Sequence, residues 1–163
     1  MPDTQTLSYP HDFRTPHRFV LDVPGDWVIL ESPGTLFAAA APADHAGPWI
    51  NVTVAHERIA AGQQETTFVR ESARRREADN GIEITGEAGF EGPKGDSRYL
   101  RVSEYADPAT GERCSRLDVS IVAPNPIGFL VDDMFVLSFI TPAGDDLAPA
   151  ETSMEILASF QFV

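Results

Sequence analysis

The sequence predicts an α+β domain in which a central antiparallel or mixed β-sheet is flanked by helices. Most of the expected strands follow one another directly, two segments have the apolar periodicity of helices, and repeated strand–helix–strand units are absent. The chain has 163 residues, 42% of them hydrophobic, which is enough for one sizeable core. We therefore expect a single α+β domain at 18–163, preceded by a proline-containing N-terminal arm at 1–17.

Apolar residues with a period of two predict a series of short strands. In the first, Phe19, Leu21 and Val23 share one face. The expected strands span residues 19–23, 27–31, 35–41, 50–55, 82–90, 98–105, 114–123 and 134–140. The last of these is almost continuously apolar, which is typical of a strand covered on both faces. We therefore expect it at the centre of the sheet.

Two segments have the pattern of amphipathic helices. The first is expected at 65–78, ended by Asn80 and Gly81, and the second at 149–158, with Pro149 in its first turn. The apolar stripe of the second helix is expected to comprise Ala150, Met154, Leu157 and Ala158.

The strands 98–105 and 114–123 alternate regularly enough to predict their register. Burying their apolar residues together requires Val102 opposite Leu117 and Leu100 opposite Val119, with a four-residue loop at 108–111. The other face is then polar and aromatic, and we expect it to be open to water. Tyr and Arg are enriched at protein interfaces, so this face is a candidate partner-binding surface, and a merely solvated face is the alternative. Its residues are Tyr99, Arg101, Ser103, Arg116 and Asp118.

The charge of the chain argues against several classes of partner. The formal net charge of −13 repels nucleic-acid phosphates and anionic membranes, and neither is expected as a partner. No apolar run is long enough for a membrane-spanning helix. The first residues do not form a signal peptide, and the single cysteine fits a reducing compartment. We expect a cytoplasmic protein.

Reactive and metal-binding residues are few and scattered. The four histidines, His11, His17, His45 and His56, lack the spacing of a helical metal site, and Cys114 in a strand is usually structural. Two adjacent pairs of aspartates, at 132–133 and 145–146, are interpreted as turn residues rather than cation ligands. We expect no metal and no cofactor.

Four short motifs occur in an order that resembles the PsbP-like superfamily. They are Phe19-Val-Leu-Asp-Val-Pro-Gly-Asp-Trp27, Ile50-Asn-Val-Thr-Val54, a Thr-Phe-Val-Arg-Glu helix and Ile156-Leu-Ala-Ser-Phe160. Within the superfamily the chain resembles actinobacterial LpqN/LpqT-type lipoproteins and DcrB-type domains, over about residues 18–162.

This resemblance implies a central antiparallel sheet flanked by helices. It also implies a binding role, because members include a photosystem subunit, a Ran-binding import factor and cytosolic effector chaperones of bacterial secretion. No shared set of catalytic residues comes with the superfamily. The sequence departs from the lipoproteins because it lacks their signal and lipidation cysteine, which favours a cytosolic adaptor or chaperone.

Three functions therefore compete. The leading hypothesis is a non-catalytic protein-binding module, an adaptor or secretion chaperone that binds another protein or a second copy of itself. The connection at 124–133 offers a further association surface through Ile127 and Phe129, unless this segment folds back as core. The alternative is a small-ligand carrier or sensor with an apolar pocket near Trp27, Phe37 and Trp49. An enzyme that uses His56 or Cys114 is the third hypothesis.

Overall fold

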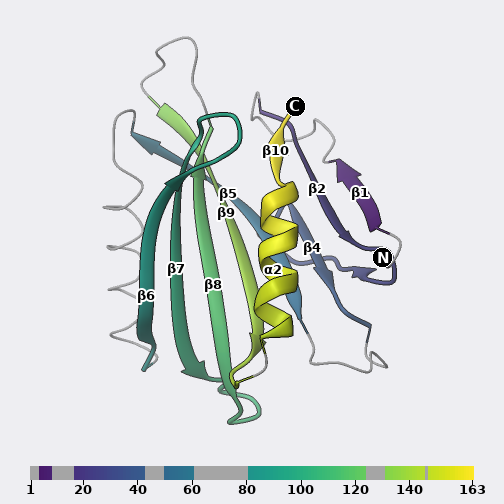
Figure 1. Cartoon of the computed structure of the whole chain (residues 1–163), viewed down its shortest axis with the longest axis vertical. Coiled ribbons are helices and arrows are strands. Elements are labelled where there is room, and N and C mark those ends of the chain that lie inside the picture. The colour runs from purple at the N-terminus through teal and green to yellow at the C-terminus, as the bar shows by residue number, and fades with distance from the viewer. Residues whose placement is uncertain (1–3, 9–16, 43–49, 61–80, 124–130, 146) are drawn as a thin grey trace.

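The computed structural model describes residues 4–8, 17–42, 50–60, 81–123, 131–145 and 147–163. These residues form two antiparallel sheets and one helix (Figure 1). The strands are β1 (Thr4–Ser8), β2 (Phe19–Pro24), β3 (Val28–Ile29), β4 (Phe37–Ala40), β5 (Asn51–Ala60), β6 (Glu83–Glu91), β7 (Ser97–Ala106), β8 (Arg113–Val122), β9 (Val131–Pro142) and β10 (Gln161–Phe162). The helix, α2, spans Ala148–Ser159. It is not long and apolar enough to cross a membrane, and no other described segment forms a helix that could.

The larger sheet has seven strands in the order β3-β4-β5-β9-β8-β7-β6. Strand β9 occupies the fourth position, so the prediction that the apolar run at 134–140 lies at the sheet centre is confirmed. Met134 and Phe135 point to opposite faces and are both fully buried, which explains why this strand has no polar face there. Strand β3 forms one edge and β6 the other.

The expected helix-flanked α+β architecture is wrong. The described residues form mainly β structure, and their only helix is the twelve-residue α2. A second, three-stranded sheet, β1-β2-β10, accompanies this helix. The sequence did not predict this sheet, because Thr4–Ser8 and Gln161–Phe162 are short strands that pair with β2 from opposite ends of the chain. The first expected helix, at 65–78, lies outside the described residues.

The predicted register of the β7–β8 hairpin is confirmed. Val102 pairs with Leu117 and Leu100 with Val119. The amide of Asp107 donates to the carbonyl of Glu112 (2.8 Å), which leaves the predicted four-residue loop at 108–111. The two strands are long and alternate cleanly, so only one register brings their aliphatic residues together.

The main core lies between the seven-stranded sheet and the layer formed by α2 and β2. The rings of Phe19, Phe135 and Phe160 pack together there, with centroid distances from 5.2 to 6.5 Å. The apolar stripe predicted for α2 was mostly wrong: of its four residues only Leu157 is buried, and Met154 is 47% exposed. The buried residues of α2 are Pro149, Ser153, Ile156 and Leu157.

One buried arginine joins α2 to the turn between β6 and β7. Arg98 is 3% exposed, and its Nε donates to Asp96 at 2.6 Å. Its Nη1 and Nη2 donate to the carbonyls of Leu157 (3.2 Å) and Phe160 (3.0 Å), at the C-terminal end of the helix. The carbonyl of Leu157 also accepts from the amide of Phe160 at 3.2 Å, so the guanidinium adds a second donor there and binds the Phe160 carbonyl, while Asp96 compensates its charge.

Candidate functional site

The loop between β3 and β4 is a tight turn that projects a short hairpin at the sheet edge. The amide and the hydroxyl of Thr35 both donate to the carbonyl of Ser32, at 3.2 and 2.8 Å. Pro33 fixes the first central position of this turn, and Gly34 has a φ of 79° at the second. This Pro-Gly pair is the signature of a type II turn. It reverses the chain so that Leu30 donates to Ala38 at 2.9 Å.

Strand β3 and the residue that follows it expose three consecutive apolar side chains. Val28 and Ile29 are each 49% exposed, and Leu30 is 45% exposed. Because successive residues of a strand point to opposite faces, apolar surface is exposed on both faces of this edge. Edge strands are usually protected by charges or proline, and residues 28–30 carry neither. A contiguous apolar edge of this kind marks an interaction site.

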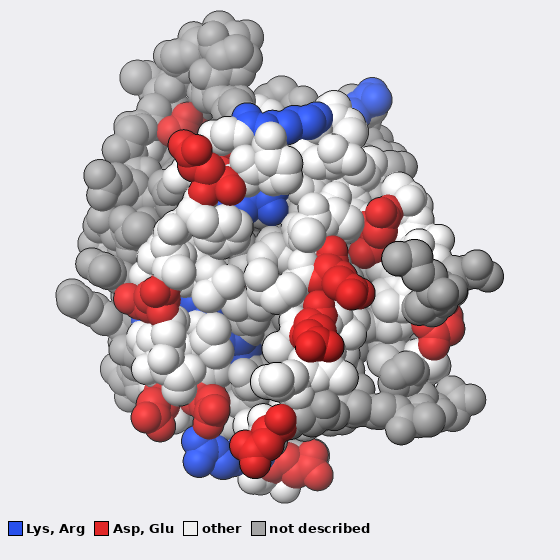
Figure 2. All heavy atoms as spheres, in the orientation of Figure 1, with Lys and Arg blue, Asp and Glu red and all other residues white. Residues whose placement is uncertain are grey.

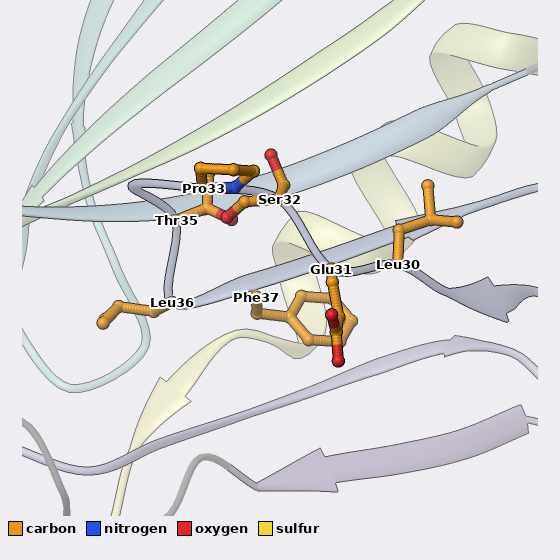
Figure 3. Close-up of a pocket in the computed structure, with 7 residues that line it drawn as sticks. All are labelled: Leu30, Glu31, Ser32, Pro33, Thr35, Leu36 and Phe37. Carbon is orange, nitrogen blue, oxygen red and sulfur yellow. The ribbon is translucent and has the colours of Figure 1, made fainter.

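A shallow hollow of about 480 Å³ lies beside this edge. Figure 3 shows that its lining comes from the loop between the two strands and from the start of β4. Leu30, Leu36 and Phe37 supply apolar surface, and Glu31 supplies a carboxylate. The remaining lining residues are Ser32, Pro33 and Thr35. The hollow could therefore accept an apolar side chain flanked by a positive charge.

The stretch of sequence that contains this edge is acidic. Residues 19–57 include five acidic residues and no Lys or Arg. The acidic residues are Asp22, Asp26, Glu31, Asp44 and Glu57. Figure 2 also shows acidic side chains over α2, where Glu151 and Glu155 are exposed. This excess of acidic residues, with Glu31 in the lining of the hollow, favours a cationic partner.

The three predicted pocket residues do not form one pocket. Phe37 lines the hollow beside β3, but Trp27 is 5% exposed and belongs to the core. Trp49 lies outside the described residues. The amide of Trp27 donates to the carbonyl of Pro24 at 3.0 Å, which closes the turn after β2.

The face predicted to be open to water is largely buried. Tyr99, Arg101 and Ser103 are each only 4 to 5% exposed, so the expectation of an open face is wrong at these positions. Arg101 lies 3.6 Å from Glu87 on β6. Arg116 and Asp118 are half-buried and form an ion pair at 2.8 Å, with Ser138 bonded to both. A partner could reach these residues only after a rearrangement, and their binding role stays a prediction. The other predicted association residues, Ile127 and Phe129, lie outside the described residues.

A cluster that the sequence did not predict forms where β9 begins. Asp133 accepts from His56 at 2.7 Å and from His17 at 3.1 Å, one imidazole on each carboxylate oxygen. Arg58 lies 3.8 Å away. Burial raises the pKa of Asp133, but the hydrogen bonds and charges of His56 and His17 outweigh it and hold the pKa below its usual value.

This cluster gives His56 a structural partner, and its role as a catalytic base stays a hypothesis. No group of His, Cys, Asp and Glu side chains among the described residues is arranged to hold a metal ion. Cys114 is 1% exposed, and burial followed by the charges of Asp107 and Glu112 raises the pKa of its thiol. A raised pKa disfavours the thiolate that nucleophilic chemistry requires.

Sequence reasoning missed the hairpin edge as a site. The signal was present in Val28-Ile29-Leu30, which run without a polar residue into Glu31-Ser-Pro-Gly. A strand that ends in a type II turn signal after three consecutive apolar residues has no polar face to turn toward water. The His17–Asp133–His56 cluster gave no such signal, because its members are far apart in the sequence.

Comparison with known proteins identifies the fold. No protein-family model matches the chain, and no curated protein matches its sequence. Among solved structures, LpqN of Mycobacterium tuberculosis, involved in cell envelope biogenesis, aligns with a TM-score of 0.63 and 18% identity, covering 98% of this chain and 91% of LpqN.

Two further structures align at lower similarity. The Ran-binding protein Mog1p of Saccharomyces cerevisiae gives a TM-score of 0.54 at 12% identity, covering 99% of this chain and 96% of Mog1p. PA94, a Pseudomonas aeruginosa protein of unknown function, gives 0.53 at 14% identity, covering 83% of this chain and 88% of PA94. The chain therefore has the PsbP-like fold seen in LpqN, which confirms the resemblance that its sequence motifs indicated.

Proposed function

We propose that this chain is a non-catalytic module that binds another protein through the β3–β4 hairpin edge. The observation that carries the proposal is the run of three half-exposed apolar residues, Val28, Ile29 and Leu30, in and just after the edge strand β3. Leaving this surface in water is unfavourable, and a protein partner would cover it. The fold is shared with Mog1p, a Ran-binding protein, so this architecture is compatible with protein binding.

An adaptor or chaperone role in the cytoplasm is the specific form of this proposal. The acidic character of residues 19–57 supports a basic partner, as expected for a module that holds a cationic client segment. Self-association through the same edge is disfavoured, because each copy has a net charge of −13 and would bring its Glu31 toward the other.

The test compares the partners that two serine variants, one triple and one double, capture from native lysate. Val28, Ile29 and Leu30 are changed to Ser in one, and the exposed Leu147 and Met154 are changed to Ser in the control. Both sets are exposed, so each variant should keep its melting temperature within a few degrees. Partners captured by the wild-type chain and the control but lost by the edge variant support the proposal. Equal capture by both variants, or capture of no partner by the wild-type chain, contradicts it.

A small-ligand carrier is a second candidate, favoured by the hollow beside Phe37. Its volume of about 480 Å³ is within the ~300 to 1,000 Å³ of small-molecule sites. Native mass spectrometry of freshly purified protein tests this candidate. A ligand mass that is retained by the wild-type chain and lost in Phe37→Ala would favour a carrier. The mass of the bare chain in several preparations would contradict this function.

A further inference from the structure

Among the described residues, the backbone of β3 pairs with another strand on one side alone. Leu30 donates to Ala38 on β4, and Val28 pairs with Ala40. In an antiparallel ladder, successive residues direct their N–H and C=O groups to alternate sides. The N–H and C=O of Ile29 therefore point away from β4, and no described strand lies on that side.

The neighbouring outward-facing groups define how far this open edge extends. On one side of Ile29, the carbonyl of Trp27 is bound by the side-chain amide of Gln5 at 3.1 Å. On the other side, the amide of Leu30 points to Ala38, so the alternation directs the next N–H, that of Glu31, outward. The open edge thus begins at Ile29 and continues toward Glu31 and the hollow.

We propose that this edge accepts an extended segment of a partner protein as an added antiparallel strand, and that this segment carries apolar residues and at least one Lys or Arg. The inference rests on the proposed function, because it specifies how the same edge binds. Main-chain hydrogen bonds to Ile29 and Glu31 supply affinity, and side-chain contacts supply selectivity. The apolar side chains cover Val28, Ile29 and Leu30, and the cation lies near Glu31 in the hollow.

Charge complementarity decides which occupant fits the edge. Glu31 lines the hollow beside the edge, and residues 19–57, which contain this edge, include no Lys or Arg. An acidic or neutral segment would gain no electrostatic attraction here, and a second copy of this chain would be repelled. A basic extended segment is therefore the occupant that the edge favours.

The experiment uses synthetic peptides on the full-length chain. The probe is a fluorescent peptide, Lys-Val-Lys-Val-Lys-Val-Lys. Its matched controls are the Glu-Val counterpart and an Ala-rich helical peptide with the same number of lysines. Binding is measured by anisotropy, and the site is located from the backbone amide shifts of the ¹⁵N-labelled protein. We expect the Lys-Val peptide to bind more tightly than both controls and to shift the amides of Ile29 and Glu31.

Two variants test the backbone contact and the charge separately. Ile29→Pro removes the outward N–H and places a ring at the open edge, whereas Ile29→Val keeps the N–H. We expect Ile29→Pro to weaken peptide binding about tenfold and Ile29→Val to change it less than about twofold. Glu31→Gln should weaken binding about two- to fivefold at low salt. Continued protection of the Leu30 amide from hydrogen exchange shows that the hairpin is intact.

The outcomes separate this inference from the proposed function. Equal binding of the Lys-Val peptide to the Ile29→Pro and Ile29→Val variants overturns strand addition. Equal binding of the helical peptide overturns it too. Sedimentation that reveals a dimer abolished by Ile29→Pro makes a second copy the occupant and also overturns the proposal. In each case, loss of lysate partners from the serine edge variant would still support protein binding at this edge.

Discussion

The Nε2 atom of His56 lies 2.7 Å from Oδ1 of Asp133, across the pairing of β5 and β9. The other carboxylate oxygen accepts from Nδ1 of His17, which lies two residues before the start of β2. One carboxylate therefore connects β5 and β9 of the seven-stranded sheet with the residues that lead into β2 of the three-stranded sheet. The ring of His56 also lies 5.2 Å from that of Phe135, so this polar link borders the aromatic core.

Asp133→Asn should destabilise the protein in a pH-dependent manner. The pKa of Asp133 is lowered on folding, so the ionised carboxylate contributes stability above the unfolded pKa of ~3.9, and this contribution is lost as the pH falls through the folded pKa. We expect a loss of about 1.5–3 kcal/mol at pH 5, because hydrogen bonds to a charged group are removed. The difference between wild type and variant should shrink below about pH 4.

Urea denaturation at a series of pH values from 5 to 2.5 measures this difference. Asp145→Asn is the control, since Asp145 is exposed. A difference between wild type and Asp133→Asn that is constant over this pH range would show that the carboxylate charge does not stabilise the fold.

The sequence predicted the strands and one register well, because these depend on local alternation. In β7 and β8, Leu100 and Val102 can meet Leu117 and Val119 in only one way. The same pattern could not decide how each face is covered. Arg101 is nearly as buried as Tyr99, and its polarity wrongly suggested a solvated face.

The parts that the sequence did not predict depend on pairing between distant segments. Strand β2 lies between β1 and β10, and neither β1 nor β10 has an apolar pattern long enough to predict a strand. The stripe of α2 was misplaced for a related reason. Ser153 is buried with its hydroxyl satisfied, since it donates to the carbonyl of Pro149 at 2.8 Å, and hydrophobicity alone would not place it inward.

Phe135→Ala should be among the most destabilising single changes in the main core. Phe135 is fully buried on the central strand and packs against the rings of Phe19, Phe160 and Phe162. Truncation loses the transfer free energy of the ring and leaves a cavity, for an expected cost of about 3–5 kcal/mol. Phe90→Ala is the matched control: this ring is 39% exposed on β6, and its removal should cost less than about 1 kcal/mol. Chemical denaturation of both variants checks the prediction, and equal losses would contradict it.

Arg98→Lys should destabilise the junction between α2 and β7. A lysine cannot reproduce the three donors that Arg98 directs at Asp96 and at the carbonyls of Leu157 and Phe160. We expect a loss of about 2–3 kcal/mol, with faster hydrogen exchange in the last turn of α2. Arg113→Lys is the control, because Arg113 is 66% exposed and its ion pair with Glu104 is a surface contact. A loss below about 0.5 kcal/mol for Arg98→Lys would show that the charge alone maintains the junction.

Gly92→Ala tests the same junction through the backbone. A Cβ atom at position 92 would collide with Nε of Arg98 and both carboxylate oxygens of Asp96, so the buried ion pair would have to shift. The amide of Gly92 donates to the carbonyl of Asp96 at 2.7 Å, which limits how far the backbone can retreat. We expect a loss of about 1–3 kcal/mol, the usual cost of overpacking a filled site.

Gly144→Ala is the matched control, because a Cβ there meets nothing within 4 Å, and its effect should stay within about 0.5 kcal/mol. Combining Gly92→Ala with Asp96→Ala relieves the clash, so the double variant should lose less stability than the sum of the two single variants. Strict additivity in denaturation experiments would show that the cost at position 92 does not come from the Asp96–Arg98 pair.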